Sequence, residues 1–376
     1  IDLLILVVRA AGVFYYRRRR CFIASFVFPQ VCCFFSVNCY IYPERPLLLD
    51  DQMAPALAHK EADISLVAAP LDRRFSVAPM MDRTDRHDRY LLRQISPCAP
   101  LYTDIVTTGA ILHGDTDRFL KFDPAEHPVA IQLGGSNPDD LARCTEIAAL
   151  RGYDEVNLNV GCPSDRVQNA QFGACLMNHP DLVASCIARM IDAVDIPVTV
   201  KTRIGVDHRD SWEEFRGFVE TVAASGCSVF IIHARKAWLQ GLSPKENREI
   251  PPLSYETVYR LKQEYPNLNV GINGGITKTA EAAEHLKHVD GVMIGRAAYQ
   301  NPWLLAEIED AVLGGAPAAS REAALEGYLN YIDRELAQDV PLYAMARHAL
   351  GLFQGRRGAR AWRRYISENG PKQGAG

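Results

Sequence analysis

The chain lacks several features that would assign it to a protein class at once. Its 376 residues carry a net charge of only −4, so no field of one sign surrounds the molecule and a nucleic-acid partner would need a local patch. Its ten cysteines include no CxxC pair, and no histidines have zinc-finger spacing, which predicts no metal site. The 48% hydrophobic and 23% charged content excludes a disordered or collagen-like chain.

The unpaired cysteines favour a reducing, cytosol-like compartment for the folded part. Most free cysteines in proteins are buried small apolar residues. We expect this of Cys98, Cys144, Cys186 and Cys227, and we expect Cys175, among apolar neighbours, to be a packing residue.

Residues 1–50 differ from the rest of the chain. Four arginines, Arg17 to Arg20, precede an uncharged run over 21–42 that is long enough to span a bilayer. Three interpretations compete: a membrane anchor or signal, an Arg-rich organelle transit sequence, and a translated upstream stretch without selected structure. The Phe- and Cys-rich composition favours the last two. We expect 51–74 to be a linker, with the folded part having no membrane partner and lying in the cytoplasm, or in an organelle stroma or matrix if the segment is a transit sequence.

From residue 75 onward, short β-rich runs alternate with amphipathic stretches of helical length. Eight strands are predicted over 75–80, 101–106, 129–133, 155–160, 198–202, 229–233, 269–272 and 291–294. Helices are predicted between them, over 85–95, 138–151, 181–193, 211–225, 255–265 and 277–288. This count favours a (β/α)8 TIM barrel over 75–315, followed by a small C-terminal helical domain over 316–376. A doubly wound open sheet is the alternative, although no GxGxxG turn follows the first strand.

Polar residues stand at the ends of seven predicted strands, where such barrels carry their catalytic groups. These residues are Pro79 to Asp82, Gln132, Asn159 to Cys162, Lys201, His233, Asn273 to Gly275, and Gly295 with Arg296. Taken singly, each has a structural explanation, such as a loop cap, a core histidine or a lysine whose stem lies along apolar surface. Together they predict one site at one rim of the barrel.

The glycines after the last two predicted strands indicate the kind of ligand. Gly274, Gly275 and Gly295 expose backbone N–H groups beside Arg296, where barrels hold phosphate, so a phosphorylated cofactor is expected. A cation such as Lys201 would stabilise a reduced flavin, whereas pyridoxal phosphate would use a lysine as a Schiff base. Cys162, in a Gly-Cys-Pro turn, favours flavin because a thiol there suits proton donation to a flavin-reduced double bond.

The C-terminal segment concentrates positive charge. Between residues 341 and 370 only one acidic residue, Glu368, accompanies Arg347, Arg356, Arg357, Arg360, Arg363 and Arg364. Tyr343, Phe353, Trp362 and Tyr365 are interleaved with them, which is typical of an RNA-binding surface. A solvated helix face is the usual explanation of such a run. Gly355 and Gly358 predict that the arginines are presented from a turn.

Several long motifs, spread over residues 75–368, resemble those of the tRNA-dihydrouridine synthases of subfamily A. They are Ala78-Pro79-Met80-Met81-Asp82, Val106-Thr107-Thr108-Gly109-Ala110, Gln132-Leu133-Gly134-Gly135, Asn157-Leu158-Asn159-Val160-Gly161-Cys162-Pro163-Ser164, Ile232-His233-Ala234-Arg235-Lys236-Ala237-Trp238, and the stretch 243–253.

The resemblance implies an enzyme that reduces the C5–C6 double bond of particular uridines in the D-loop of tRNA, with flavin mononucleotide (FMN) as cofactor and NADPH as electron source. Cys162 would protonate C5 and Asn159 would face the uracil. The enzyme is expected to be monomeric, with NADPH using the flavin cleft. The flavin would be held by Pro79, Met80, Met81, Gln132, Lys201, His233, Asn273, Gly274, Gly275, Gly295 and Arg296. The tRNA would be held by Lys245, Arg248, Arg360 and Arg363.

Two positions depart from the family pattern: Arg83 stands where the family commonly has Trp, and Asp88 where it often has Cys. Two other functions stay open. One is a flavin barrel acting on a free pyrimidine, against which the arginine-rich tail argues. The other is a catalytically silent tRNA-binding protein, which Arg83 makes conceivable. Bound flavin would argue against the silent tRNA-binding protein. Dihydrouridine formed on tRNA but not on free uridine would argue against the enzyme of free pyrimidines.

Overall fold

The computed structural model describes residues 7–8, 13–18, 21–26, 71–372 and 374–375, and the chain forms two compact units, 1–67 and 68–376. In the first unit, β1 (Val7–Val8), β2 (Val13–Arg18) and β3 (Cys21–Phe26) form an antiparallel sheet. Most of the uncharged run over 21–42, and the expected linker up to residue 70, lie outside the described residues. Within the described part, no helix has the length and apolar character needed to cross a membrane.

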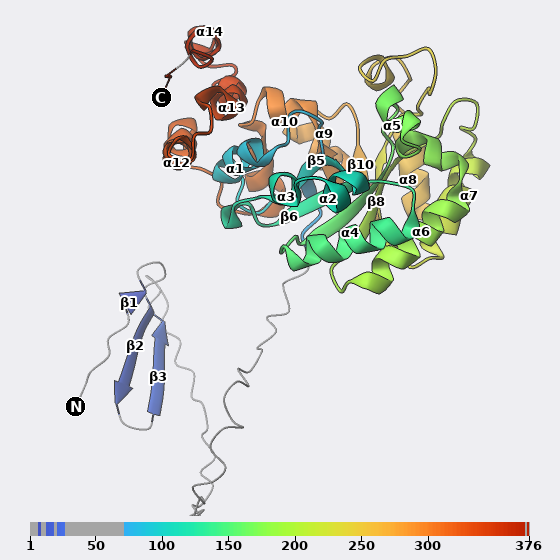
Figure 1. Ribbon diagram of the computed structural model, residues 1–376, viewed down its shortest axis with the longest axis horizontal. Coiled ribbons are helices and arrows are strands. Elements are labelled where there is room, and N and C mark those ends of the chain that lie inside the picture. Colours follow the sequence, from blue (N-terminus) through green and yellow to red (C-terminus); the bar gives the residue numbers. More distant parts are fainter. Residues whose placement is uncertain (1–6, 9–12, 19–20, 27–70, 373, 376) are drawn as a thin grey trace, which may run out of the picture. The chain divides into compact units, whose positions relative to one another are not determined.

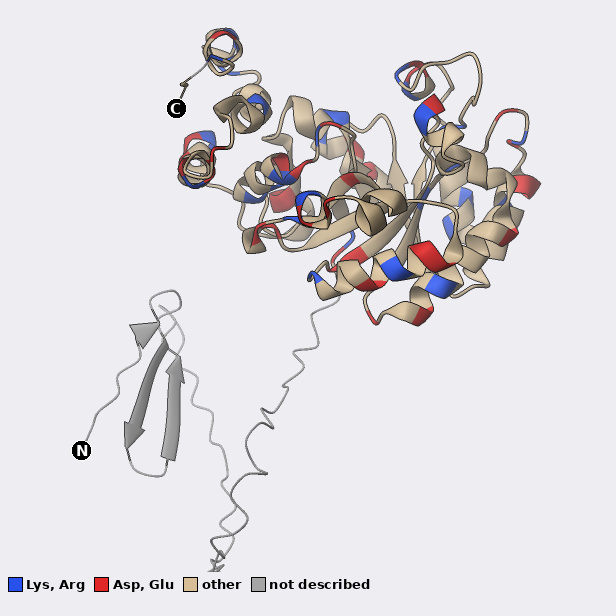
Figure 2. Ribbon diagram, viewed as in Figure 1, with Lys and Arg blue, Asp and Glu red and all other residues tan. Residues whose placement is uncertain are grey.

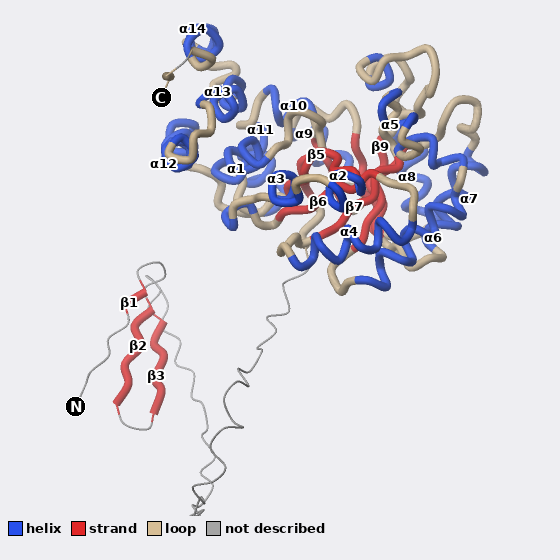
Figure 3. Tube along the Cα trace, viewed as in Figure 1, coloured by secondary structure: helices blue, strands red, loops and turns tan. Residues whose placement is uncertain are grey.

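Eight parallel strands of the second unit close into a barrel. Each strand pairs with its neighbours in the sequence, and the last strand pairs with the first. The strands lie at the centre, with the helices around them (Figure 3), so the predicted (β/α)8 barrel is confirmed. The strands are β4 (Phe75–Val77), β5 (Leu101–Thr107), β6 (Val129–Gly134), β7 (Glu155–Val160), β8 (Val198–Arg203), β9 (Val229–His233), β10 (Asn269–Asn273) and β11 (Gly291–Ile294).

The barrel helices begin at polar caps that the sequence signals. The Asp85 carboxylate accepts the N–H groups of His87 and Asp88 at the start of the first helix, and Ser211 with Glu214 forms a capping box. The helices are α1 (Arg86–Ile95), α2 (Thr108–His113), α3 (Thr116–Leu120), α4 (Pro138–Leu150), α5 (Asp165–Asn169), α6 (Pro180–Ala193), α7 (Trp212–Ala223), α8 (Tyr255–Glu264), α9 (Thr279–His285), α10 (Arg296–Gln300) and α11 (Leu304–Ile308). The helix expected over 277–288 is thus shorter than predicted.

The inside of the barrel is unusually polar. A small apolar cluster of Ala78, Tyr102, Ala130, Ile231 and Met293 fills part of it, and the large aliphatic core lies elsewhere. The side chains of Gln132, Asn157 and Thr199 are also completely buried, although such barrels are usually filled by branched aliphatic residues. Buried polar groups need hydrogen-bond partners, so this interior has to be organised by hydrogen bonds.

One of the cysteine predictions is wrong. Cys144, Cys186 and Cys227 are buried as expected, but Cys98 is exposed. Its apolar character does not bury it, because it lies in the short connection between α1 and β5, and connections run over the surface of a domain.

Three C-terminal helices, α12 (Arg321–Leu336), α13 (Leu342–Ala346) and α14 (Ala359–Asn369), lie at one side of the barrel (Figure 1). A short 3-10 helix, η5 (Arg347–Gly351), connects the last two. The ring of Tyr331 on α12 stacks on Tyr90 of α1 at 4.0 Å, and Arg86 pairs with Glu335 at 2.5 Å. These helices belong to the same compact unit as the barrel; the domain boundary at 315/316 stays a prediction.

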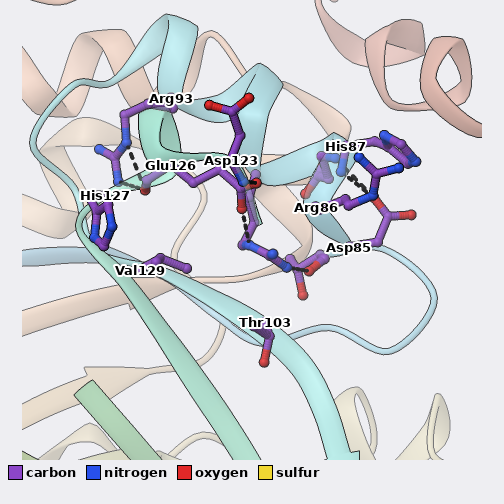
Figure 4. Close-up of polar contacts among 12 residues, drawn as sticks. Asp85, Arg86, His87, Arg93, Thr103, Asp123, Glu126, His127 and Val129 are labelled. Carbon is purple, nitrogen blue, oxygen red and sulfur yellow. Dashed lines mark hydrogen bonds and ion pairs between the residues drawn. The ribbon is translucent and has the colours of Figure 1, made fainter. Parts of the chain in front are cut away.

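Helix α1 is fastened to the barrel by buried arginines. Arg89 pairs with Glu126 at 2.7 Å, and Arg93 donates to the carbonyl oxygen of Glu126 at 3.0 Å (Figure 4). A further Arg93 nitrogen donates to the carbonyl of Ser96 at 2.8 Å. Since the C-terminal helices pack on α1, these contacts also determine where those helices lie on the barrel.

Asp88, one of the two departures from the family pattern, lies in this region and is fully buried. Its Oδ1 is 3.5 Å from Nδ1 of His348 on η5, and Nε2 of the same imidazole is 3.1 Å from Asp85. Burial raises the pKa of Asp88 to about 7, although His348 opposes the shift. The aspartate is thus part of the contact between α1 and the C-terminal helices.

We expect Asp88→Asn to remove a pH-dependent loss of stability. Between about pH 4 and pH 7 the folded chain keeps a proton on Asp88 that the unfolded chain has released, so the free energy of unfolding of wild type falls as pH rises through this range. The asparagine variant lacks that contribution. Its stability relative to wild type should therefore increase from pH 4 to pH 7, by about 1.4 kcal/mol per unit of pKa difference.

Urea unfolding of both proteins at several pH values measures this difference. His87, whose pKa is lowered to about 4 mainly by burial, contributes the opposite slope between about pH 4 and pH 6.5. It is present in both proteins and so cancels in the comparison. A constant difference between wild type and variant across the range would contradict the prediction.

Candidate active site

The ends of four neighbouring strands converge at the carboxyl-terminal rim of the barrel. Asn159 on β7 is in register with Lys201 on β8, and His233 on β9 is in register with Asn273 on β10. The Lys201 ammonium donates to Oδ1 of Asn273 at 3.1 Å, and Asn273 Nδ2 donates to the carbonyl of Met293 at 2.7 Å. The structure therefore brings together these four predicted site residues.

The two basic groups of this cluster are poorly solvated. Burial, assisted by the nearby Arg203, lowers the pKa of Lys201 to about 7, while Cys162 opposes the shift. Burial and the charges of Arg203 and Lys201 lower the pKa of His233 well below its ordinary value, so its imidazole is neutral. Nε2 of this ring is buried without a hydrogen-bond partner in the described part of the chain. A lysine and a histidine in this condition are typical of a functional site.

The backbone beyond β10 has the conformation that its glycines permit. Gly274 and Gly275 have φ angles of 119° and 74°, which L side chains rarely adopt. A Cβ on Gly275 would lie 2.7 Å from Leu253 and from Tyr255, so this turn also has no space for a side chain. The turn follows Asn273 directly, at the place where the sequence predicts a phosphate loop, and the binding of phosphate there stays a prediction.

The first and last strands meet at the same rim. A Cβ on Gly295, after β11, would lie 3.7 Å from the sulfur of Met80, after β4. Pro79 and Met80 are half-buried and Met81 is exposed. Arg296 is exposed, and its guanidinium pairs with Glu249 at 2.8 Å. The predicted phosphate ligand thus has a carboxylate partner that the sequence analysis did not identify.

Arg83, the other departure from the family pattern, lies just beyond β4. Its guanidinium stands over the ring of Tyr299 on α10, 4.6 Å from the ring centroid, which is a cation–π contact. The positive charge at this position is therefore paired with an aromatic ring from the last barrel unit.

Cys162 lies in a tight turn after β7. The N–H groups of Gly161 and Cys162 donate to Oδ1 of Asn159 at 3.2 and 3.0 Å, and the cysteine sulfur is 3.5 Å from the Ser164 hydroxyl. Cys162 is half-buried, so the turn holds it at the rim without enclosing it completely.

Cys175, by contrast, lies in the 3-10 helix η2 (Gly173–Asn178). Its sulfur is 3.0 Å from the carbonyl oxygen of Phe172, and burial raises the pKa of its thiol. This environment makes its thiolate less available than an ordinary cysteine thiolate.

Arg203, to which the sequence analysis assigned no role, contacts the turn that carries Cys162. It is 3% exposed, and its Nε donates to the carbonyl of Gly161 at 2.8 Å. One terminal nitrogen donates to the carbonyls of Lys236 and Asn247, at 3.0 and 3.1 Å. The guanidinium thus joins the Cys162 turn to the loop after β9. The only signal in the sequence is an arginine directly after the predicted strand over 198–202.

The predicted tRNA contacts lie in two regions. Lys245 is exposed beside the short 3-10 helix η3 (Glu246–Arg248), and Arg248 is half-buried there. Its carbonyl accepts from Arg296 at 3.4 Å, so this loop borders the site. Arg360 and Arg363 are exposed on α14, which lies apart from the barrel (Figure 1).

The glycines before α14 break the helix as predicted, but they present only Arg356 and Arg357 from a turn, because Arg360, Arg363 and Arg364 lie on α14 itself. Gly355 and Gly358 have φ angles of 78° and 91°, and α14 begins directly after Gly358.

The barrel helices carry both basic and acidic residues (Figure 2). Among the described residues, no group of His, Cys, Asp and Glu side chains could hold a metal ion.

Comparison with known proteins finds similarity to a solved structure and to several relatives in sequence. An old yellow enzyme homologue from Zymomonas mobilis has a similar structure, with a TM-score of 0.47 and 14% identity over 69% of this chain and 95% of that one. Curated relatives named tRNA-dihydrouridine(20/20a) synthase are much more similar in sequence. The protein from Shewanella oneidensis is 62% identical over 81% of this chain and 91% of its own length. The protein from Escherichia coli K12 is 59% identical over 80% and 88%.

A family model described as dihydrouridine synthase matches residues 76–375, which include the C-terminal helices and all of the barrel except Phe75, the first residue of β4. With this match and relatives of such identity, the chain belongs to the dihydrouridine synthase family.

Proposed function

We propose that this chain is an FMN-dependent tRNA-dihydrouridine synthase that reduces the C5–C6 double bond of D-loop uridines, with NADPH as electron donor. The curated relatives, named tRNA-dihydrouridine(20/20a) synthases, support this activity. The observation that carries it is the cluster of Lys201, His233 and Asn273 on the same rim as the thiol of Cys162.

The rim suits a flavin phosphate because it holds polar groups without acceptors. Nε2 of His233 and the Nε atoms of Arg235 and Arg248 are buried without hydrogen-bond partners in the part of the chain that the structure describes. Among the described residues, Lys201 has one acceptor, Asn273, for three ammonium protons. A flavin ring and its phosphate would supply the acceptors that these groups lack.

In this proposal Lys201 and His233 hold the ring edge, and Gly274, Gly275 and Arg296 hold the phosphate. Pro79 to Met81, Gln132, Asn273 and Gly295 complete the binding site. When bound, the flavin supplies a hydride and NADPH restores it. In its charged form, Lys201 stabilises negative charge on the adjacent flavin ring. This stabilisation is stronger than in water because the site is poorly solvated.

The thiol of Cys162 supplies the proton. Hydride addition at C6 of uracil leaves C5 as the position that takes a proton, and the S–H bond of Cys162 breaks to form the C5–H bond. The thiolate then regains a proton from solvent, which reaches it because the residue is only half-buried. Arg203, which fixes the turn through Gly161, keeps the sulfur at the rim.

The activity can be tested with purified protein, FMN, NADPH and tRNA from cells that lack dihydrouridine. We expect a visible flavin spectrum and dihydrouridine at D-loop positions, mapped by mass spectrometry, with free uridine unchanged. Reduction of free uridine as fast as tRNA would instead support an oxidoreductase of free pyrimidines. A colourless protein that binds tRNA without reducing it would support a catalytically silent binding protein.

The arginines of α14 provide a separate prediction about RNA binding. Because a phosphate contact releases condensed counterions, each lost contact should flatten the dependence of log affinity on log salt by about 0.7–0.9. We therefore expect the double variant Arg360→Ala, Arg363→Ala to bind tRNA more weakly at low salt and with a smaller salt slope. A binding titration at several salt concentrations measures both quantities.

The matched control is Arg216→Ala, Arg260→Ala, which removes two half-exposed arginines from α7 and α8 on the barrel. It removes the same charge and should leave the slope unchanged. If both double variants keep the wild-type slope and affinity, the charge run on α14 is a solvated helix face.

A further inference from the structure

A line of hydrogen bonds begins inside the barrel at the base of β7. The carboxylate of Glu155, 1% exposed, accepts the hydroxyl of Thr199 at 2.7 Å. The same hydroxyl oxygen accepts Nδ2 of Asn157 at 2.8 Å. Glu155 and Asn157 are on β7 and Thr199 is on β8, so this part of the line crosses between neighbouring strands.

The line continues to the rim through two more side-chain amides. Gln132 Nε2 donates to Oδ1 of Asn157 at 2.7 Å, and Asn159 Nδ2 donates to Oε1 of Gln132 at 2.8 Å. Oδ1 of Asn159 then accepts the N–H groups of the Cys162 turn. The hydrogen bonds thus connect Glu155, at one end of the barrel interior, with the proposed proton donor at the other.

The direction of every bond in this line is fixed by its two ends. Backbone N–H groups only donate, so they require an oxygen from Asn159. A carboxylate only accepts, so Glu155 requires the Thr199 hydroxyl to donate and leaves the Thr199 oxygen to accept from Asn157. Each amide in between has one possible orientation that satisfies both neighbours.

Two contacts keep Glu155 an acceptor. The guanidinium of Arg73 pairs with its Oε2 at 2.5 Å, and the hydroxyl of Tyr102 donates to its Oε1 at 2.5 Å. Burial and the adjacent carboxylate raise the pKa of Tyr102 well above its ordinary value, so this hydroxyl stays a donor. Tyr102 therefore contacts the same oxygen as Thr199 but is not part of the line.

We propose that Glu155 and Thr199 are positioning residues for the candidate active site. Together with the N–H groups of the turn, they fix the direction of the line, and so they support Asn159 with its carbonyl oxygen toward the Cys162 turn and its amino group toward Gln132. The effect of Glu155 and Thr199 on uridine reduction rests on the proposed function, whereas their effect on the backbone of the Cys162 turn does not.

Thr199→Val tests the proposal in the full chain, because it removes the hydroxyl and keeps the shape of the side chain. The line is then broken between Glu155 and Asn157, and the orientation of Asn159 is supported only by the N–H groups of the turn. We expect hydrogen exchange of the Gly161 and Cys162 amides, measured by mass spectrometry, to be faster by about tenfold or more. We expect uridine reduction on tRNA to be slower by about 10- to 100-fold, as for misplaced catalytic groups.

Tyr102→Phe is the matched control, since it removes a buried hydroxyl from the same carboxylate oxygen without breaking the line. In this variant, the hydrogen-exchange rates of the turn amides and the rate of uridine reduction should stay near wild type. We expect this even if the variant lowers the unfolding midpoint as much as Thr199→Val does. Thr199→Ser keeps the hydroxyl and should restore both readouts. Where Thr199→Val does not fold, Glu155→Gln replaces it, because an amide at this position no longer requires Thr199 to donate.

Equal exchange of the turn in Thr199→Val and Tyr102→Phe would overturn the proposal and reduce the line to a contribution to stability. So would unchanged exchange in Thr199→Val, or an exchange defect that Thr199→Ser does not repair. A wild-type chain that reduces no uridine, but whose turn exchanges faster in Thr199→Val alone, would refute the proposed function and support the positioning role.

Discussion

Replacing Cys162 by alanine is expected to slow uridine reduction by about 10²–10⁴-fold, the usual contribution of a positioned acid. The variant removes the proposed proton donor and leaves the turn in place, because Asn159 holds that turn through backbone N–H groups. Flavin content and flavin reduction by NADPH should be close to wild type. Single-turnover measurement of the two half-reactions separates these effects.

Cys175→Ala is the matched control, because it removes a second thiol from the same segment of the chain. The Cys175 sulfur lies against the Phe172 carbonyl and has no part in the proposed proton transfer. This variant should reduce uridine nearly as fast as wild type. If the two cysteine variants lose the same activity, or if Cys162→Ala turns over normally on tRNA, Cys162 is not the acid.

Replacing Lys201 by methionine is expected to slow flavin reduction by about 10²–10³-fold, the effect of removing one electrostatic group from a poorly solvated site. Methionine keeps the length of the side chain and removes the charge. Because the pKa of Lys201 is lowered to about 7 in the chain alone, its amine is mostly neutral at pH 8. A bound anion raises that pKa, so FMN binding at pH 8 should take up a proton.

Calorimetry of FMN binding in buffers with different ionisation enthalpies measures this proton uptake. Wild type should show it at pH 8 and lose it below pH 6, where Lys201 is already charged. Lys201→Met should show none at either pH. Proton uptake that persists in the variant would assign it to another group.

Arg296→Ala provides the contrast with Lys201→Met. A charge-assisted contact to phosphate contributes to binding, so this variant should lose flavin on gel filtration, whereas Lys201→Met should keep more flavin and reduce it slowly. If both variants purify with full flavin and normal reduction rates, the placement of the ring and the phosphate at this rim is wrong.

The barrel could be predicted from the sequence because its signals are local. Apolar runs of strand length alternate with capped amphipathic segments, and seven predicted strands agree with the structure to within one residue at each end. The exception is β4, which ends at Val77 rather than at 80, because the next residues turn onto the rim. The Gly274–Gly275 turn could also be predicted from the sequence, because the φ angles that it requires exclude most residues other than glycine.

The amino-acid pattern predicts which segments form the barrel strands and which residues follow their carboxyl ends, because parallel strands in one sheet bring those ends to one edge. The partners of the buried polar side chains, by contrast, depend on how the elements pack. Arg73 and Glu155 are 82 positions apart, and Asp88 meets His348 only because the C-terminal helices pack on α1. Burial in a low-dielectric interior makes such partners necessary, but their identity depends on how the elements pack, and no local pattern records it.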